Sequence, residues 1–260
     1  MTHGKLYHIG FGKDDLGERS PTIALLSGDP ERARLIAHSY LDSVRLLSEN
    51  RGLNSYLGIL PNGKTLLSAT SGMGAPSTSI VVNELIQIGI KLIIRVGTCG
   101  SIQEHLSVGS IVITNAALCR QGAANDIAPV EYPAAADPFV TVALVKAARE
   151  LKVKHYMGVT ASVDTFYEGQ ERTQFMNRQL LRSLRGMTEE YRSLNVLNYE
   201  MECGTLLKMA GVYGFRAGCV CGVVGQRTVS EKVILEQKDV AIDNAIKVAV
   251  QAAEQWEFET

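Results

Sequence analysis

Short, almost uninterrupted runs of apolar residues alternate with amphipathic segments along this 260-residue chain, and this alternation most limits what it can fold into. Neighbouring side chains of a strand point to opposite sides of a sheet, so a strand that is apolar at successive positions must be covered on both faces. Helices packed on each side of one sheet provide that cover. The pattern predicts an α/β fold, a three-layer α/β/α sandwich with a central mixed β-sheet.

Local signals place the elements of this fold. Asp29 and Pro30 mark a helix start, because aspartate caps free N–H groups and proline fits the first turn. Pro61-Asn62-Gly63 predicts a hairpin between two strands. The polar segment 168–195 is expected as a surface excursion. Strands are expected over 22–27, 54–60, 64–71, 91–96, 110–116, 156–162 and 217–224, and helices over about 30–40, 76–88, 138–151, 203–213 and 233–256.

Composition excludes several classes of function. The chain is 46% hydrophobic and 20% charged, with a formal net charge of −1 and no shift in composition along its length. One domain spanning residues 1–260 is therefore expected. Binders of nucleic acid or membrane surfaces carry a basic surplus, so neither partner is expected, and a recognised anion should be small. Without a secretory signal or an apolar run of about 18 residues, the expected location is the cytoplasm.

The five cysteines and five histidines show no metal-ligand spacing, so no metal site is expected. An odd number of cysteines without framework spacing also argues against a disulfide scaffold. Cys219 and Cys221 lie two apart in an apolar run and are expected on opposite faces of a strand. We interpret all five cysteines as reduced, buried thiols.

Two segments place arginines where strands end. Ser27-Gly28-Asp29-Pro30-Glu31-Arg32 joins a strand to a helix N-terminus, a favourable place for an anion. Taken alone, this turn is better explained as a structural one with a solvated arginine. Arg95 lies inside an apolar strand just before Gly97-Thr98, where open α/β sheets bind ligands. A buried arginine needs a bound anion or a buried carboxylate such as Glu84, and these two explanations are equally favoured.

The segment from Thr70 to Leu85, TSGMGAPSTSIVVNEL, is far more specific. Two glycines end a strand, and Pro76 with Ser77 opens a helix. As a string it matches the signature of the purine and uridine phosphorylase family, which the chain resembles from about Tyr7 to its C-terminal helix. The same resemblance is carried, in family order, by Gly28-Asp-Pro-Glu-Arg32, Arg95-Val-Gly-Thr98, Pro129-Val-Glu-Tyr-Pro133, Asp164-Thr-Phe166-Tyr, Gly169-Gln170-Glu-Arg172 and Asn198-Tyr-Glu200-Met201-Glu202.

The resemblance implies three binding regions. A phosphate site would be formed by Gly28, Arg32, Arg95 and Thr98, together with Arg51 from a neighbouring subunit. A ribose site would be formed by Glu200, Met201 and Glu202, with His8 from the same neighbour. A base site would be formed by Phe166, Gln170, Arg172 and Arg227. Without the resemblance, Gln170 and Arg172 would be interpreted as surface loop residues and Phe166 as a core residue.

The implied reaction is phosphorolysis, in which clamped phosphate attacks a sugar that develops positive charge as the base leaves. The amide of Gln170 has both a donor and an acceptor, which suits a uracil edge. Purine-type members carry an aspartate after the late apolar strand, where this chain has Gly225-Gln226-Arg227. The expected activity is therefore that of the uridine branch, acting on uridine and also deoxyuridine or thymidine, in pyrimidine salvage.

Some features of the family are in doubt or open. Gly52 stands where a glutamate helps relatives hold a monovalent cation between subunits, so potassium dependence is doubtful and no cofactor is expected. Cys203 replaces a usual serine, which we interpret as a benign change. The shared sites imply a homo-oligomer, a hexamer built from dimers. The alternatives are a purine nucleoside phosphorylase, a nucleosidase of the same fold, or a non-catalytic nucleoside-binding relative.

Overall fold

The computed structural model describes residues 4–173, 176, 179–228 and 235–258, and in this part of the chain the strands form one nine-stranded mixed sheet. Their order across the sheet is β2-β3-β4-β1-β5-β8-β7-β6-β9. The strands are β1 (Ile23–Ser27), β2 (Asp42–Ser48), β3 (Ser55–Ile59), β4 (Thr65–Thr70), β5 (Leu92–Ser101), β6 (Ile111–Arg120), β7 (His155–Val163), β8 (Asn198–Glu200) and β9 (Arg216–Gln226).

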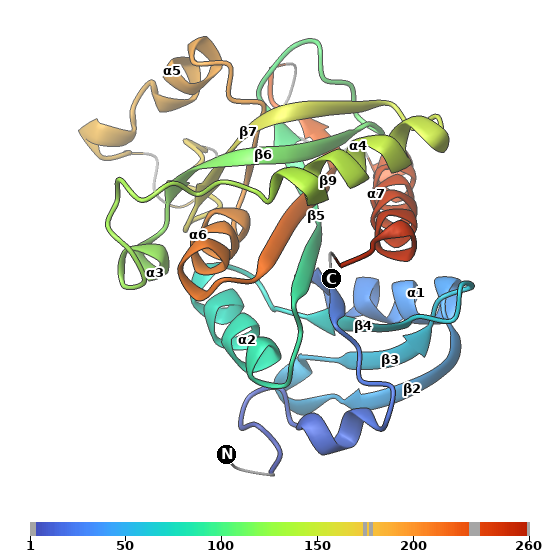
Figure 1. Cartoon of the computed structure of the whole chain (residues 1–260). Coiled ribbons are helices and arrows are strands. Elements are labelled where there is room, and N and C mark those ends of the chain that lie inside the picture. The colour runs from blue at the N-terminus through green and yellow to red at the C-terminus, as the bar shows by residue number, and fades with distance from the viewer. Residues whose placement is uncertain (1–3, 174–175, 177–178, 229–234, 259–260) are drawn as a thin grey trace.

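Helices cover both sides of this sheet (Figure 1), with α1, α4 and α7 on one side and α2, α3 and α6 on the other. The predicted α/β fold with a central mixed sheet is confirmed. The helices are α1 (Pro30–Tyr40), α2 (Ala75–Gln87), α3 (Gly122–Asn125), α4 (Pro138–Glu150), α5 (Met187–Ser193), α6 (Cys203–Tyr213) and α7 (Leu235–Gln255), with short 3-10 turns at Lys13–Leu16, Asn50–Gly52 and Arg182–Leu184.

Two hydrophobic cores explain why the strands are apolar at successive positions. In β1, Ala24 and Leu26 join the core beneath α2 and α6, whereas Ile23 and Leu25 join the core beneath α1, α4 and α7. Each residue of such a strand is buried, and full burial of a large aliphatic side chain stabilises the fold by about 1.5–3 kcal/mol. Burial on both faces of the strand is what its successive apolar positions predicted, and helices provide this cover on each face.

One half of the sheet closes on itself, a feature that no local sequence signal predicts. Strand β9 pairs antiparallel with β6 and also parallel with β5 over ten positions, from Leu92↔Arg216 to Ser101↔Gln226. Strands β5, β8, β7, β6 and β9 therefore form a closed circuit, while β1, β4, β3 and β2 extend from β5 as an open wing. Closure removes two free strand edges and places the carboxyl ends of β5 and β9 side by side.

Most element boundaries agree with the prediction, but β5 and β6 continue to Ser101 and Arg120, beyond their predicted ends, and the short helices α3 and α5 were not predicted. The side chain of Asp29 accepts a hydrogen bond from the Glu31 N–H at 2.9 Å and caps α1, and the predicted hairpin joins β3 to β4. The helix predicted over 233–256 is α7, and the first part of that range lies outside the described residues. The two strands that were missed, β2 and β8, are an exposed edge strand and a strand of three residues.

Two expectations need correction. Cys219 and Cys221 lie on the same face of β9, with their Sγ atoms 3.7 Å apart, because residues two apart in a strand share a face. The segment 168–195 is also more than a surface excursion. Its helix α5 buries Met187 and Tyr191 in a small cluster with Tyr199.

In the described part of the chain no helix is both long and apolar enough to cross a bilayer.

Candidate active site

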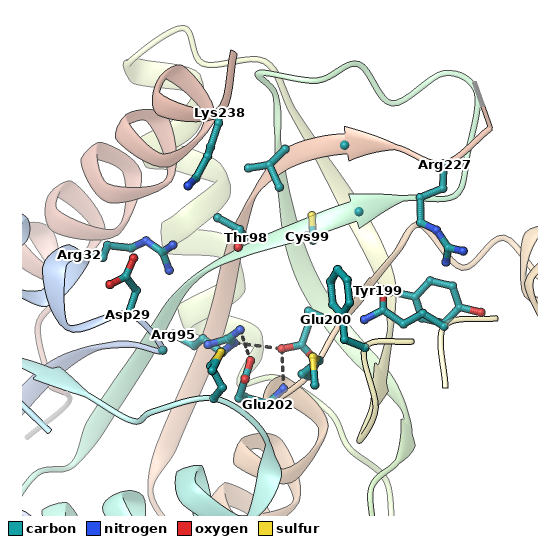
Figure 2. Close-up of a pocket in the computed structure, with 18 of the residues that line it drawn as sticks. Asp29, Arg32, Arg95, Thr98, Cys99, Tyr199, Glu200, Glu202, Arg227 and Lys238 are labelled. Atoms are coloured by element: carbon teal, nitrogen blue, oxygen red, sulfur yellow. Dashed lines mark hydrogen bonds and ion pairs between the residues drawn. The ribbon is translucent and has the colours of Figure 1, made fainter. Parts of the chain in front are cut away.

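A pocket of about 530 Å³ lies where β1, β5 and β9 end and α1 and α6 begin (Figure 2), and its volume is typical of small-molecule sites. All but two of the site residues predicted from the sequence line this pocket. They are Gly28, Arg32, Arg95, Thr98, Phe166, Gln170, Arg172, Glu200, Met201, Glu202 and Arg227.

Arg95 is the most buried cation of the pocket, with 4% of its surface exposed. Its Nε donates to Glu200 Oε2 at 3.0 Å, and its Nη2 pairs with Glu202 Oε2. Burial lowers the pKa of the guanidinium, but the two carboxylates outweigh burial and hold this pKa above its usual range. The buried Nη1 makes no hydrogen bond within the described residues. The sequence left two explanations for Arg95, a bound anion or a buried carboxylate such as Glu84. The structure shows an ion pair with Glu200 and Glu202 rather than with Glu84, and it leaves Nη1 available for an anion.

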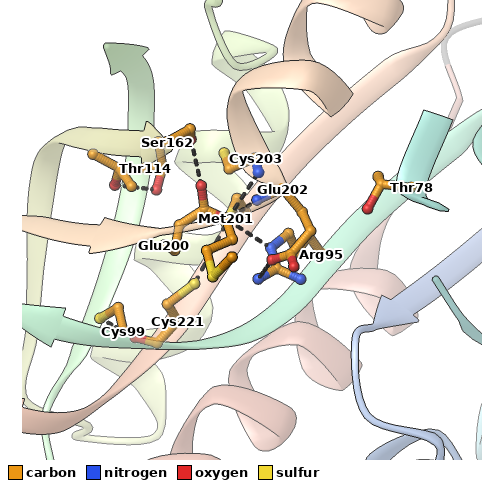
Figure 3. Close-up of polar contacts among 12 residues, drawn as sticks. Thr78, Arg95, Cys99, Thr114, Ser162, Glu200, Met201, Glu202, Cys203 and Cys221 are labelled. Atoms are coloured by element: carbon orange, nitrogen blue, oxygen red, sulfur yellow. Dashed lines mark hydrogen bonds and ion pairs between the residues drawn. The ribbon is translucent and has the colours of Figure 1, made fainter. Parts of the chain in front are cut away.

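Glu200 is a positioning residue because its two carboxylate oxygens are occupied by protein groups (Figure 3). One oxygen accepts from Ser162 Oγ. The other accepts from Arg95 Nε and from the backbone N–H groups of Glu202 and Cys203, at 2.9 and 2.8 Å. The same carboxylate of Glu200 therefore accepts from free N–H groups at the start of α6 and fixes the orientation of the Arg95 side chain.

Glu202 is linked to the glycine-rich turn between β4 and α2. Its Oε1 accepts a hydrogen bond of 2.6 Å from the Gly74 N–H, and only 5% of the residue is exposed. Burial raises the pKa of this carboxyl, although the Arg95 charge opposes the shift. Gly74 itself has φ = +85°, a conformation that favours glycine. The signature segment therefore positions an acidic acceptor over the pocket.

Arg32 extends the cationic end of the pocket from the first turns of α1. Its Nη1 donates to the Val96 carbonyl at 3.2 Å, while its buried Nε makes no hydrogen bond within the described residues. Burial, and then the charge of Arg95, lower the pKa of this guanidinium. A Cβ on Gly28 would lie 3.3 Å from the Gly72 carbonyl oxygen and 4.0 Å from Arg95 Nη1. Arg32 is thus not the solvated arginine that its hexapeptide alone suggested.

The other end of the pocket is built by residues 166–172. Gln170 and Arg172 are buried, with 3% and 8% of their surface exposed, and Arg172 Nη2 lies 3.5 Å from Gln170 Oε1. The Arg172 guanidinium carbon lies 4.3 Å from the centre of the Phe166 ring, which is 42% exposed. Interpreted without the family context, all three residues would have been assigned to the wrong environment.

Glu171 and Arg227 hold this end of the pocket in place through their contacts with neighbouring elements. Glu171 has φ = +55° and accepts hydrogen bonds from the Gly186 and Thr188 N–H groups at the start of α5. Arg227 hydrogen-bonds through its backbone N–H to Ser101 O, and its guanidinium carbon lies 5.2 Å from the centre of the Tyr199 ring. Because Thr188 Oγ1 lies 3.1 Å from Tyr199 Oη, the end of β9 and the start of α5 both contact the Tyr199 side chain.

His8 and Arg51 are the two predicted site residues that do not line the pocket of their own chain. Asn50 Nδ2 donates to the carbonyls of Tyr7 and His8, and Arg51 Nη2 donates to Tyr7 Oη at 2.9 Å. His8 Nδ1 lies 2.6 Å from Glu84 Oε1. Tyr7 and Asn50 therefore hold His8 and Arg51 close together, outside the pocket of their own chain.

Comparison with known proteins shows the family of this chain. The sequence model of the phosphorylase superfamily matches residues 22–254. This chain belongs to the phosphorylase superfamily. Over 253 residues, 97% of this chain and 98% of the relative, it is 41% identical to the uridine phosphorylase of Salmonella typhimurium. It is 37% identical to that of Thermococcus kodakarensis, over 98% of this chain and 89% of the relative. It is also 29% identical to the guanosine phosphorylase of Halorubrum lacusprofundi, over 88% and 92%.

The sequence did not reveal several residues that line this pocket or support it from behind. Gln121 is fully buried, and it holds the Met201 carbonyl with its Nε2 at 2.6 Å and the Thr205 N–H with its Oε1 at 2.8 Å. Ser162 and Gln121 thereby fix the start of α6, and only their burial identifies them. Lys238 of α7 lines the pocket but occurs in a polar stretch that is typical of a solvated helix face. Within the described residues, no group of three or more His, Cys, Asp or Glu side chains could bind a metal.

Proposed function

We propose that this protein is a uridine phosphorylase, a pentosyltransferase that reversibly converts uridine and orthophosphate into uracil and ribose 1-phosphate. One observation carries the proposal most directly. Arg95 is held by two carboxylates with Nη1 left for a ligand, beside Arg32 and across one pocket from Gln170 and Arg172. The relatives that are named uridine phosphorylases, at 35–41% identity over nearly the full chain, support the same activity.

At the phosphate end, Arg32, Arg95, Thr98 and the backbone of Gly28 bind orthophosphate beneath the sugar. A phosphate oxygen forms a bond to the anomeric carbon while the bond from that carbon to the base nitrogen breaks. The electron pair of the broken bond moves into the leaving uracil, which later takes a proton from water. Clamped phosphate supplies both nucleophile and compensating charge, so positioning provides most of the acceleration.

At the sugar, Glu202 accepts hydrogen bonds from the ribose hydroxyls, and Met201 contacts the ring. Glu200 reaches the ribose mainly through the residues that it holds, because its oxygens are engaged by Ser162, Arg95 and the start of α6. Charge-assisted hydrogen bonds of this kind are about twice as strong as neutral ones, and they orient the ring for attack.

At the base, Gln170 pairs with the uracil edge, and Arg172 stabilises the oxygen on which the leaving charge collects. Phe166 and Arg227 enclose the ring, and deoxyuridine and thymidine are accepted as further substrates. Pyrimidine specificity is supported by the end of β9, where Gly225, Gln226 and Arg227 offer no carboxyl group to protonate a purine. The match to a guanosine phosphorylase keeps purine phosphorolysis as the second candidate.

The working unit that we propose is a dimer with shared sites, assembled into a hexamer. His8 and Arg51 of one subunit complete the ribose and phosphate sites of the next, because neither residue lines its own pocket. Gly52 adopts φ = +73°, which favours glycine and leaves no side chain to bind a cation, so activity without added potassium is expected. Uracil recovery in the cytoplasm, as part of pyrimidine salvage, is the cellular role that we propose.

Phosphate-dependent turnover of uridine, thymidine, inosine and adenosine is the decisive assay. We expect uracil and ribose 1-phosphate from uridine only when orthophosphate is present, and little turnover of either purine nucleoside. Persistent uracil release in phosphate-free buffer would indicate a nucleosidase. Faster turnover of inosine than of uridine would instead favour the purine candidate, and no turnover of any of the four would favour a non-catalytic relative.

Replacing Gln170 by alanine is expected to impair base selection. The change leaves the uracil edge without its donor and acceptor, so kcat/KM for uridine should fall by about 10²-fold, the effect of losing one to two buried hydrogen bonds to a reacting group. The KM for phosphate should stay within about twofold, since Gln170 lies at the far end of the pocket from Arg32. A rise in the phosphate KM with an unchanged uridine KM would contradict the assignment.

A further inference from the structure

Lys238 is the one residue of α7 that lines the pocket among the described residues. It lies near the start of the helix, which begins at Leu235, and its side chain is half-buried. Figure 2 shows this side chain extending from α7 with its amino group directed toward the part of the pocket that Arg32 and Thr98 line. A third element, besides α1 and β5, therefore supplies a cation to the phosphate end.

No carboxylate in the described part of the chain is paired with Lys238. Of the pocket carboxylates, Glu200 and Glu202 hold Arg95, and Asp29 caps α1. By contrast Lys247, farther along the same helix, forms an i,i+4 ion pair of 2.6 Å with Asp243. The amino group of Lys238 is thus a charge at the pocket for which the described protein provides no counter-ion.

The charges around the pocket call for an anion at this end. Among the described lining residues, Arg95 has two carboxylate partners, whereas Arg32 and Lys238 have no ion-pair partner. Burial and the charge of Arg95 lower the pKa of Arg32 although Asp29 and Glu202 oppose this shift, so a further negative group would stabilise the charged guanidinium. A ligand with two negative charges would satisfy Arg32 and Lys238 together.

We propose that Lys238 is a further phosphate-binding residue of this pocket. It contacts the orthophosphate oxygens from the side of α7 while Arg32 and Arg95 hold them from α1 and β5. In the reverse direction it contacts the phosphate group of ribose 1-phosphate. This inference rests on the proposed phosphorolysis and adds a residue that the motif-based assignment does not contain.

The experiment compares K238M, K238R and K247M with the unchanged protein. Methionine keeps the length of the lysine side chain and removes its charge, and K247M removes a charge from an exposed site on the same helix. For each variant, the KM for phosphate and for uridine is measured over a range of ionic strength, with kcat and the thermal midpoint recorded.

For K238M we expect a phosphate KM about tenfold higher, the scale of losing one partly screened charge contact. The uridine KM and the thermal midpoint should be nearly unchanged. The phosphate KM of K238M should also depend less on salt, because one of the screened charges is gone. K238R should retain most of the phosphate affinity, and K247M should behave like the unchanged protein.

A phosphate KM of K238M equal to that of K247M would overturn the inference and leave phosphorolysis intact. Equal increases in the phosphate and uridine KM would also overturn it, since a lysine that merely docks α7 would disturb both. Failure of the proposed function itself is seen separately, as uracil release by the unchanged protein that does not depend on phosphate.

Discussion

Replacing Arg95 by alanine is expected to reduce kcat/KM for uridine phosphorolysis by about 10³-fold or more, the scale for losing a preorganised group that stabilises transition-state charge. In the proposed site, Arg95 directs to the phosphate its Nη1, which has no hydrogen-bond partner among the described residues, so its removal takes away both an anion contact and the alignment of attack. Turnover close to that of the unchanged enzyme would contradict the assignment of Arg95 to the phosphate site.

The same substitution should also destabilise the fold, so activity and stability must be measured together. Alanine leaves Glu200 and Glu202 buried without their cation, and breaking a buried ion pair in this way costs about 3–5 kcal/mol of unfolding free energy. Arg216→Ala is a matched control, because Arg216 forms a 2.8 Å ion pair with Asp137 at the start of β9, whereas the pocket lies at the end of that strand. We expect this control to stay active, and R95K to retain part of both properties.

Mixing two inactive variants should restore activity if the sites are shared between subunits. Arg51→Ala alone is expected to lower kcat/KM by about 10²-fold, since a phosphate contact is lost. In a two-fold dimer of R51A with R95A, one site has both alanines and the other has both arginines. Random co-assembly should thus recover about a quarter of the sites, which co-expression followed by a uridine assay would measure.

This mixing experiment has a clear negative outcome. If Arg51 served a pocket within its own chain, every site in the mixed assembly would still lack one arginine, and activity would remain at the level of the parents. A pair of R95A with R32A is the control, because both residues line the same pocket of one chain and cannot complement each other.

Much of the fold was predictable because its signals are local. The successive apolar positions of β1 required cover on both faces, and the Asp29 cap fixed where α1 begins. The closure of β9 onto β5 was not predictable, because it depends on the pairing of strands far apart in the chain. Strand β2 was missed because its exposed edge position allows Asp42 and Arg45 among few apolar residues, and β8 because three residues give no periodic pattern.

The motifs predicted which residues gather at one pocket, but they did not predict the environment of those residues. Nothing local distinguishes Gln170 and Arg172 from polar loop residues, and their burial depends on contacts made through Glu171 and α5. The carboxylate partners of Arg95 could not be identified either, since Glu200 and Glu202 follow it by more than a hundred residues. Lys238 was not predicted as a pocket residue because a lysine in an amphipathic helix usually lies on its solvent-exposed face.

The single carboxylate of Glu200 has a consequence for how this pocket can change during evolution. It ties the arginine of β5, the serine of β7 and the first turn of α6 to one point, so the phosphate and ribose sites that we propose keep a common geometry. The residues that we propose to enclose the base come instead from segment 166–172 and the end of β9, which line the other part of the pocket. A lineage can therefore remodel which nucleobase it accepts while the chemistry at the anomeric carbon is inherited unchanged.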